Sequence, residues 1–272
     1  MSPIPLGSFG FSVDVQDEDS HLATALTIEG LGFGTLWING GALDRLDRLT
    51  DLLRATTTAM VGSSIITPDR YSPADVAQVY ARAEQVSPGR LVVGLGSSHR
   101  PGALALLQQY LDELGRIPRQ RGLLAAFGPR ALSVARERFA GAMPMLFTPE
   151  YTAVARRSVG DDRTLSVGLY AVLDENPDRA RATARRPLTF LTSMDGYQRS
   201  LERQHFSYED VTGLSDHLVD TLVAWGAPAD VIRHANRLRA AGADHVHLTV
   251  LGDNGQPTGL AAAQMLAAEF GQ

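Results

Sequence analysis

The chain lacks two reactive side chains altogether, because none of its 272 residues is cysteine and all 25 of its basic residues are arginine. Without a thiol, the protein cannot form a disulfide, a cysteine-ligated zinc or iron–sulfur site, or a thiolate nucleophile. Without lysine, it cannot form a Schiff base, a pyridoxal phosphate linkage or a P-loop. Demanding chemistry therefore has to come from histidine, carboxylates, hydroxyls or a bound cofactor.

Long apolar runs are also absent, since no segment approaches the roughly 18 apolar residues of a membrane-spanning helix. The first residues, MSPIPLGSFGFSV, lack the basic region and hydrophobic segment of a secretory signal. We therefore expect a cytoplasmic protein without a membrane segment. The net charge of −5 argues against nonspecific nucleic-acid binding, although it does not exclude a local basic patch.

Short β-branched runs alternate with amphipathic helical patterns along the chain, which indicates parallel strands joined by crossover helices. Eight such units in one chain predict an α/β fold of the TIM type, a closed (β/α)8 barrel that forms a single domain over residues 1–272. The predicted strands are Phe9 to Val15, Thr35 to Asn39, Thr58 to Thr67, Leu91 to Leu95, Gly122 to Phe127, Ala142 to Phe147, Leu165 to Leu173 and His245 to Leu251.

Helix boundaries support this assignment. The stretch Ser72-Pro73-Ala74-Asp75 offers a cap, a proline at the first helical position and an acid in the first turn. The segment between the seventh and eighth strands, about residues 177–241, is longer than one crossover needs, and we expect three helices in this insertion. Its polar middle contains Tyr197 and either covers a pocket as a lid or is a solvated excursion.

The stretch RLVVGLGSSHR, residues 90–100, resembles the start of a dinucleotide site. In the Rossmann fingerprint a third glycine follows three residues after the second, and here His99 takes that place. The acidic residue expected about 20 positions further on falls at Asp112 and Glu113, inside a predicted helix. These departures argue against a pyrophosphate loop and favour the end of a strand in another α/β fold.

Several longer segments carry a family resemblance. VGSSIITPDRYSPADVAQVYARAEQVSPGRLVVGLGSSH is similar to the third strand, third helix and fourth strand of the bacterial luciferase-like monooxygenases, especially their actinobacterial deazaflavin-dependent oxidoreductases. LLAAFGPRALSVARERFAGAMPMLFTPEYT, AVLDENPDRARATARRPL and LVDTLVAWGAPADVIRHANRLRAAGADHVHL extend the resemblance in the same order. It implies a TIM-type barrel whose cofactor lies over the carboxyl ends of the strands, and a homodimer.

The resemblance implies a set of cofactor contacts on the third and fourth strands. By the match to GSSIITP, residues 62–68, the third strand would end in a cis peptide between Ser64 and Ile65, with Thr67 nearby. On the fourth strand, Gly96 would let a flat ring approach, and Ser97 and Ser98 would hydrogen-bond the cofactor. From the residues alone, SSII reads instead as an ordinary buried strand whose hydroxyls bond to their neighbours.

A second cofactor element is implied at Phe127-Gly128-Pro129-Arg130, which matches the strand-to-helix turn where relatives hold phosphate. Backbone N–H groups from Gly128 onward and the Arg130 guanidinium would contact that phosphate. The alternative is a proline at a first helical turn beside a solvent-facing arginine.

On the substrate side the chain departs from better-understood relatives. Many have an acid–histidine pair at the end of the second strand, where LWINGG offers Trp37 and Asn39 as pocket residues. His99 stands where one branch has a glutamate, which makes it the candidate catalytic proton donor or acceptor, unless it is only polar surface. Trp37 either walls the substrate pocket, together with Tyr197 from the insertion, or is simply core.

His245 and His247 lie two apart on a predicted strand and face the same way, as a metal pair would. No third ligand has a supporting motif, so we prefer polar packing inside the barrel and expect no metal.

We therefore predict an oxidoreductase that transfers a hydride between coenzyme F420, a deazaflavin, and a small organic substrate. An FMN-dependent monooxygenase is the first alternative. A noncatalytic flavin-binding homologue is the second, because the acid–histidine pair is missing.

Overall fold

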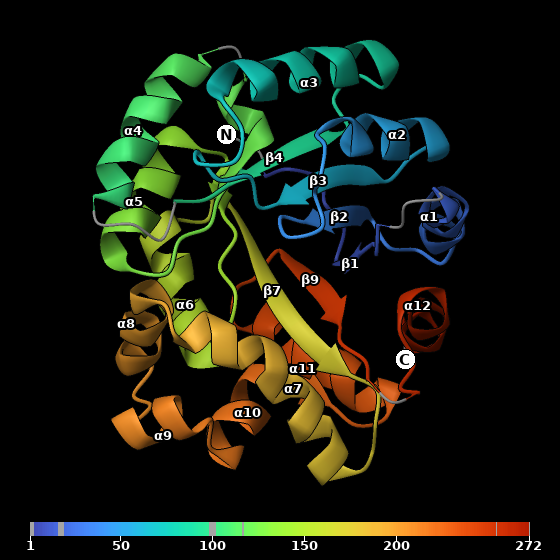
Figure 1. The fold of residues 1–272 in the computed structure, drawn as a ribbon, viewed down its shortest axis with the longest axis vertical. Coiled ribbons are helices and arrows are strands. Elements are labelled where there is room, and N and C mark those ends of the chain that lie inside the picture. The colour runs from blue at the N-terminus through green and yellow to red at the C-terminus, as the bar shows by residue number, and fades with distance from the viewer. Residues whose placement is uncertain (1–2, 16–18, 98–101, 116, 254, 272) are drawn as a thin grey trace.

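Parallel strands form the centre of the molecule, and helices lie around them (Figure 1). The computed structural model describes residues 3–15, 19–97, 102–115, 117–253 and 255–271. The central strands are β1 (Phe9–Ser12), β2 (Thr35–Asn39), β3 (Met60–Ser64), β4 (Leu91–Leu95), β5 (Gly122–Leu124), β6 (Gly141–Ala142), β7 (Thr164–Val172) and β9 (His245–Val250). The helices outside the insertion are α1 (Ser20–Gly30), α2 (Asp47–Ala55), α3 (Pro73–Val86), α4 (Ala103–Leu114), α5 (Pro129–Arg138), α6 (Pro149–Val159) and α12 (Gly259–Ala267), with a 3-10 turn at Arg119–Arg121.

The strands close into a ring. Each strand from β1 to β6 pairs in parallel with the next, β6 pairs with the start of β7, and β9 pairs with both β7 and β1. Within the described residues, eight strands thus form a closed parallel barrel with alternating helices, a TIM barrel, which confirms the predicted fold class. A ninth, short strand, β8 (Val223–Trp225), pairs only with the end of β7 and lies outside the ring.

Four strands, β1, β3, β5 and β6, are each at least three residues shorter than predicted. β2 and β4 have the expected bounds, whereas β5 and β6 are much shorter than Gly122 to Phe127 and Ala142 to Phe147. After β5 the chain turns at Gly128 into α5, and after β6 it meets Pro144, which has no N–H to donate, and Leu146, whose φ is 55°. Local backbone chemistry ends these two strands although their apolar pattern continues.

Inward and outward side chains alternate along the strands, as a packed barrel requires. On β2, Leu36 and Ile38 are buried in the layer between barrel and helices, while Trp37 is fully buried in a separate interior cluster with Met60 and Val92. A side chain at Gly62 would place its Cβ 2.3 Å from the Trp37 ring, so β3 carries glycine where the indole fills the barrel.

The predicted helix start at Ser72 is confirmed. Ser72 accepts a hydrogen bond from the N–H of Asp75, whose carboxylate bonds back to Ser72, which makes a capping box at the start of α3. In the insertion, α11 (Pro228–Ala240) likewise has a proline in its first turn and ends before Gly242, whose φ is 113°.

The expectation of three helices in the insertion is wrong. Residues 177–241, all of which the structure describes, form α7 (Pro177–Thr192), α8 (Asp195–Arg203), α9 (Tyr208–Gly213), α10 (Asp216–Leu222), β8 and α11. Serine caps at Ser207 and Ser215 start α9 and α10, which are too short for a periodic pattern to reveal.

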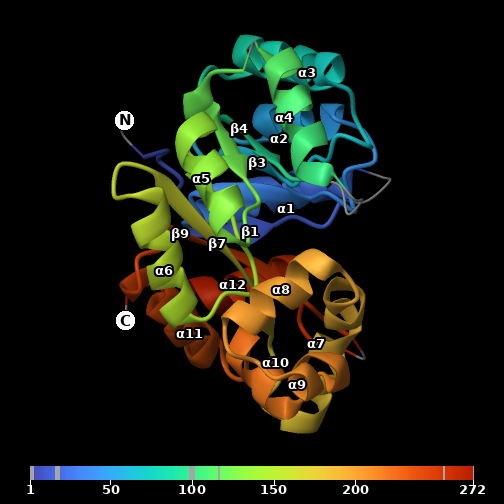
Figure 2. The same ribbon diagram turned by 90° about the vertical axis from the view of Figure 1, so that its left-hand side faces the viewer.

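The insertion packs as a unit beside the barrel, and Figure 2 shows α7 to α10 grouped together at one end of the molecule. Their apolar residues form a second core, which includes Leu188, Leu201 and Leu218. Barrel residues Phe127 and Tyr170 pack against this second core. No helix in the described part of the chain is both long and apolar enough to span a bilayer.

Candidate functional site at the barrel mouth

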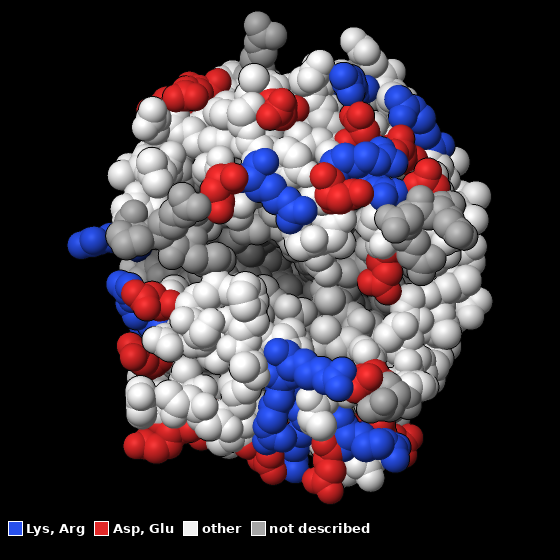
Figure 3. All heavy atoms as spheres, viewed as in Figure 1, with Lys and Arg blue, Asp and Glu red and all other residues white. Residues whose placement is uncertain are grey.

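The carboxyl ends of the barrel strands lie on the face that is viewed in Figure 1. Figure 3 shows a hollow at the centre of this face, with charged side chains on its rim rather than in the part of the hollow that the view exposes. TIM-barrel enzymes place their active sites at this end of the barrel. The strand ends around this hollow, called here the barrel mouth, form the candidate site.

Five polar side chains from adjacent strands converge at the barrel mouth. Ser12 Oγ, at the end of β1, lies 2.6 Å from His247 Nε2 and 2.7 Å from Thr249 Oγ1, both on β9. Ser12 also approaches Asn39 Oδ1 of β2 at 3.3 Å, and His247 Nδ1 lies 3.5 Å from Ser64 Oγ of β3. Ser12 and His247 are buried, whereas Asn39, Ser64 and Thr249 are half-buried. The cluster thus joins the barrel interior to the surface of the mouth.

His245 lies one inward position below this cluster. Trp37 Nε1 donates to His245 Nε2 over 3.1 Å, and His245 Nδ1 lies 2.8 Å from the carbonyl oxygen of Gly7. Because Nε2 accepts, the ring is neutral and carries its proton on Nδ1, which donates to Gly7. The predicted interior packing of His245 is what the structure contains.

Burial keeps both imidazoles neutral. It lowers the pKa of His245 to about 4, although the hydrogen bond to Gly7 raises that value slightly. Burial, with a smaller contribution from His245, lowers the pKa of His247 to about 3. The Trp37 indole stacks on His247 with ring centroids 5.1 Å apart and an interplanar angle of 25°, which holds the imidazole plane in place.

Two tyrosines border the barrel mouth on the side of the insertion. Burial raises the pKa of Tyr170 on β7 to about 12 and also raises the pKa of Tyr197 on α8, so both stay protonated at neutral pH. The Tyr197 ring packs against Phe127 at 4.5 Å between centroids. Within the described residues neither hydroxyl has a hydrogen-bond partner, so each can donate to a ligand.

The predicted contacts at the ends of β3 and β4 lie side by side. The peptide bond between Ser64 and Ile65 is cis, as the family resemblance implies. Ile66 bridges to Leu95, and the Ile65 side chain fills the space beside Gly96, where a Cβ would lie 1.9 Å from Ile65 Cδ1. Glycine at this position therefore has a packing reason of its own, in addition to the predicted approach of a ring.

The other predicted residues near the ends of β3 and β4 lie after these strands. Thr67 follows β3, and its carbonyl accepts from the N–H groups of Arg70 and Tyr71 in the turn before α3. Ser97 is half-buried directly after β4. Ser98 and His99 lie outside the described residues, so the roles assigned to them stay predictions.

The predicted phosphate element at α5 has an open first turn. Gly128 is the N-cap and offers no side-chain cap, and Arg130 is exposed. A second arginine, which the sequence alone did not indicate, comes from the insertion: a Cβ at Gly128 would lie 3.2 Å from Nη1 of Arg203 on α8. No acidic residue lies in this turn, so the local field favours an anion.

The three predicted pocket residues take different places. Trp37 is fully buried inside the barrel, which favours the core alternative over a pocket wall. Asn39 is half-buried at the barrel mouth within the polar cluster. Tyr197 is buried between the insertion and Phe127, and the polar middle of the insertion is thus partly packed rather than a purely solvated excursion.

Sequence reasoning passed over Ser12 and Thr249 and treated His247 as packing. A usable signal existed, because residues at alternate positions up to the carboxyl end of a barrel strand face its interior. Arg203 carried no such signal, since its approach to Gly128 depends on how the insertion folds back.

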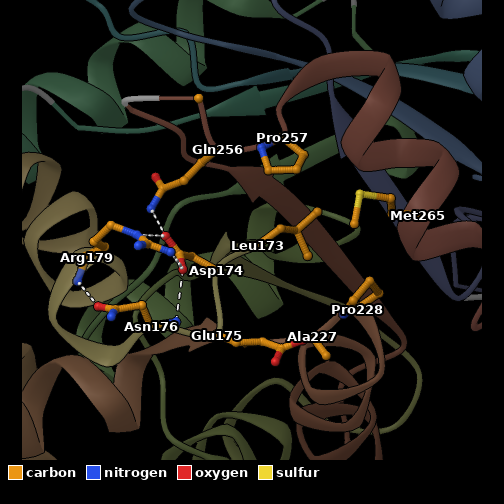
Figure 4. A pocket seen from close by; sticks show the side chains of 12 residues that line it. Leu173, Asp174, Glu175, Asn176, Arg179, Ala227, Pro228, Gln256, Pro257 and Met265 are labelled. Carbon is orange, nitrogen blue, oxygen red and sulfur yellow. Dashed lines mark hydrogen bonds and ion pairs between the residues drawn. The ribbon is translucent and has the colours of Figure 1, made fainter.

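A separate cavity of about 480 Å³ opens between the loops that follow β7, β8 and β9 (Figure 4). Asp174 lines this cavity, and its carboxylate accepts two hydrogen bonds from Arg179 and one from Gln256. The hydrogen bonds from Arg179 lower the pKa of Asp174 most, followed by those from Gln256 and from the N–H of Asn176. These polar groups already bond to one another, so we interpret Asp174, Arg179 and Gln256 as a hydrogen-bonded link, called here the loop latch, that connects the loops after β7 and β9.

In the part of the chain that the structure describes, no group of three or more histidine or acidic side chains could hold a metal ion. His245 and His247 instead bond to the backbone, to Trp37 and to serine hydroxyls.

Solved structures of low sequence identity share the fold of this chain. An F420-dependent secondary alcohol dehydrogenase in complex with an F420–acetone adduct has a TM-score of 0.75 at 16% identity, covering 97% of this chain and 98% of the other. A coenzyme F420 dependent tetrahydromethanopterin reductase from Methanopyrus kandleri has a TM-score of 0.69 at 16% identity, with the same coverage. The oxygenating constituent of 3,6-diketocamphane monooxygenase from Pseudomonas putida, in complex with FMN, has a TM-score of 0.66 at 12% identity and covers 96% of both chains.

At these identities the likeness shows the fold alone. No curated protein sequence matches the chain. Residues 9–116, which span β1 to the region after α4, match the family model of the luciferase-like monooxygenases.

Proposed function

We propose that this chain is an oxidoreductase of the luciferase-like type that transfers a hydride between coenzyme F420 and a small organic substrate. The match of residues 9–116 to the luciferase-like model carries the proposal. This segment contains the carboxyl ends of β1 to β4, and with them Ser12, Asn39, Ser64 and Gly96. Two of the fold neighbours described above are F420-dependent by name, which supports the deazaflavin over other cofactors.

The residues at the barrel mouth fit a flat ring with polar edges. Ile65 and Ala125 are partly buried beside the interior core and offer apolar surface. Asn39, Ser64 and Thr249 are half-buried and offer hydrogen bonds at the edge of that surface. Apolar faces with a few placed polar groups are typical of cofactor sites.

The start of α5 fits the phosphate of such a cofactor. Pro129 has no N–H, and within the described residues the N–H groups of Arg130 and Ala131 have no capping partner. The Arg203 guanidinium at Gly128 and the exposed Arg130 add positive charge. Gly128, Arg130 and Arg203 would therefore hold the phosphate.

When bound, the deazaflavin would supply hydride chemistry at carbon five. The chain itself would hold the ring at the ends of β3 and β4, and Tyr170 would donate a hydrogen bond to substrate, because burial keeps its hydroxyl protonated. His99 stays our candidate proton donor or acceptor on the basis of the sequence.

An FMN-dependent monooxygenase is the second candidate. The name of the matching family model and the FMN complex of the 3,6-diketocamphane enzyme favour it. The two candidates differ in the ring that binds, so cofactor affinity separates them.

The test is titration of the pure protein with coenzyme F420, FMN, NAD and NADP, followed by absorbance and fluorescence. We expect F420 to bind most tightly. Equal or tighter binding of FMN would replace the proposal with the monooxygenase, and no binding of either ring would reject both.

Two variants test the phosphate assignment. Replacing Arg203 with alanine should weaken F420 binding about 10- to 100-fold, the range for one charge-assisted contact, and leave a deazaflavin ring without phosphate unaffected. Arg199→Ala is the matched control, because Arg199 lies one turn away on α8 and pairs with Asp195. Equal loss for the phosphate-free ring would contradict the assignment.

A further inference from the structure

We propose that His247 is the centre of a neutral proton relay that runs from Ser64 on β3, through Ser12 on β1, to Thr249 on β9. The inference rests on the proposed function, which it deepens by naming a substrate of the alcohol or carbonyl class. When an alcohol becomes a carbonyl compound it loses its hydroxyl proton as well as a hydride, and that proton needs a path out of the site.

The distances form a continuous chain across the floor of the barrel mouth. Ser64 Oγ lies 3.5 Å from His247 Nδ1, His247 Nε2 lies 2.6 Å from Ser12 Oγ, and Ser12 Oγ lies 2.7 Å from Thr249 Oγ1. The contact to Ser64 is the longest of the three. Both ends of the chain, Ser64 and Thr249, are half-buried, whereas the middle is buried. A proton can therefore enter and leave at the surface while its path stays away from water.

Counting hydrogens gives two complete arrangements of the same atoms. In one, Ser12 donates to Nε2 and His247 donates from Nδ1 to Ser64. In the other, Ser64 donates to Nδ1 and His247 donates from Nε2 to Ser12, whose own proton then goes to Thr249 or to Asn39 Oδ1, which lies 3.3 Å away. The Asn39 and Thr249 oxygens supply the additional acceptors that the second arrangement requires.

Because both arrangements are satisfied, the two neutral tautomers of His247 can interconvert. The proton of the alcohol passes to Ser64 Oγ as the Ser64 proton moves to Nδ1. The Nε2 proton moves to Ser12 Oγ, the Ser12 proton to Thr249 Oγ1, and the Thr249 proton to water, and the cofactor of the proposed function would accept the hydride. Each O–H or N–H bond that breaks in the relay is replaced by one that forms, so no charge remains in the barrel.

The surroundings keep His247 neutral throughout. The titratable residues on β9 and on or just after the strands that pair with it are His245 on β9 itself, Asp14 after β1 and Tyr170 on β7, and of these His245 acts on the pKa of His247. His245 is neutral and Tyr170 protonated, and desolvation raises the pKa of the solvent-accessible Asp14 carboxyl. Burial disfavours an imidazolium at His247, and the stacked Trp37 ring holds the imidazole in place while its protons move.

His245 is the internal control, because its surroundings allow one tautomer only. Trp37 Nε1 can only donate and the Gly7 carbonyl can only accept, so the proton of His245 is fixed on Nδ1. Two buried histidines on one strand thus differ in a property that can be measured directly.

The experiment is nitrogen NMR of the cofactor-free protein with labelled histidine, with signals assigned from His247→Gln and His245→Gln variants. We expect both ring nitrogens of His247 to resonate between the values of protonated and unprotonated nitrogen, as rapid tautomer exchange requires. His245 should give one protonated and one unprotonated nitrogen. A single fixed tautomer at His247 would overturn the relay.

Ser12→Ala tests the path and also assigns the His247 signals should His247→Gln fail to fold. Removing the serine hydroxyl should shift His247 towards one tautomer and leave the His245 signals in place. An unchanged tautomer mixture at His247 in this variant would overturn the path through Ser12. The measurement needs no cofactor, so a failed F420 titration would reject the proposed function separately from this result.

Discussion

Replacing Glu29 with glutamine should lower the free energy of unfolding by about 2 kcal/mol at pH 7. The carboxylate of Glu29, in the last turn of α1, accepts hydrogen bonds from the backbone N–H groups of Thr57, Thr58 and Ala59 at 3.0, 2.6 and 2.6 Å. The hydroxyls of Thr57 and Thr58 donate to the same carboxylate. This contact ties α1 to the chain that enters β3, and a glutamine amide cannot accept so many donors.

The magnitude follows from the pKa. Partial burial raises the pKa of Glu29, but the N–H groups of Ala59, Thr58 and Thr57 lower it more, to about 2 from an ordinary value of 4.5. At 1.36 kcal/mol for each pKa unit, this corresponds to about 3 kcal/mol, which solvent screening of the half-buried group reduces to about 2 kcal/mol. Because the folded pKa is depressed, this stability is present above pH 4.5 and is lost as the pH falls towards 2.

Urea unfolding from pH 7 down to pH 3 measures the effect. The wild type should lose stability over this range faster than Glu29→Gln, so the difference between them should shrink with falling pH. Glu202→Gln on α8 is the matched control, because its exposed carboxylate has no hydrogen bond within the described residues. A difference that stays constant from pH 7 to pH 3 would refute the assignment of the stability to the ionised carboxylate.

Gly62→Ala should destabilise the barrel by about 1 to 3 kcal/mol, because the new methyl group would overlap the Trp37 ring. Thermal unfolding checks this against Gly41→Ala, where a Cβ meets nothing within 4 Å, and equal melting temperatures for the two variants would contradict the packing argument. Gln256→Leu removes the bond to Asp174 and should cost about 1 to 2 kcal/mol, with faster hydrogen exchange at Asp253, whose N–H bonds to Gln256. Unchanged exchange at Asp253 would show that the loop latch does not hold this loop.

Much of the fold was predictable from the sequence. The apolar run from Leu91 to Leu95 predicts a strand with the correct bounds, and the Ser72 cap predicts where the preceding helix begins. Both signals are local, so they can be read from neighbouring residues. The count of eight alternating strand and helix units was sufficient to predict a closed barrel. β8 and the short helices α9 and α10 were not predictable, since three to seven residues hold too few periodic positions.

The candidate site was only partly predictable. The family resemblance of GSSIITP implied Ser64 and Ile65, and the resemblance at Phe127 to Arg130 implied the turn at Gly128, whereas the residues alone favoured an ordinary strand at SSII. The contact of Ser12 with His247 joins positions 235 residues apart, and that of Gly128 with Arg203 joins β5 to the insertion, so only barrel closure and the packing of α8 bring these groups together.

The two histidines of β9 show most clearly what the sequence determines and what the tertiary structure determines. The sequence alone determined that His245 and His247 face the same side of a strand, because side chains alternate along an extended backbone. Their different surroundings were decided by the tertiary structure. Trp37 of β2 reaches His245, and serines of β1 and β3 reach His247, because strands distant in sequence become neighbours around a closed barrel. Hydrogen-bond chemistry depends on such neighbours, and a linear pattern does not specify them.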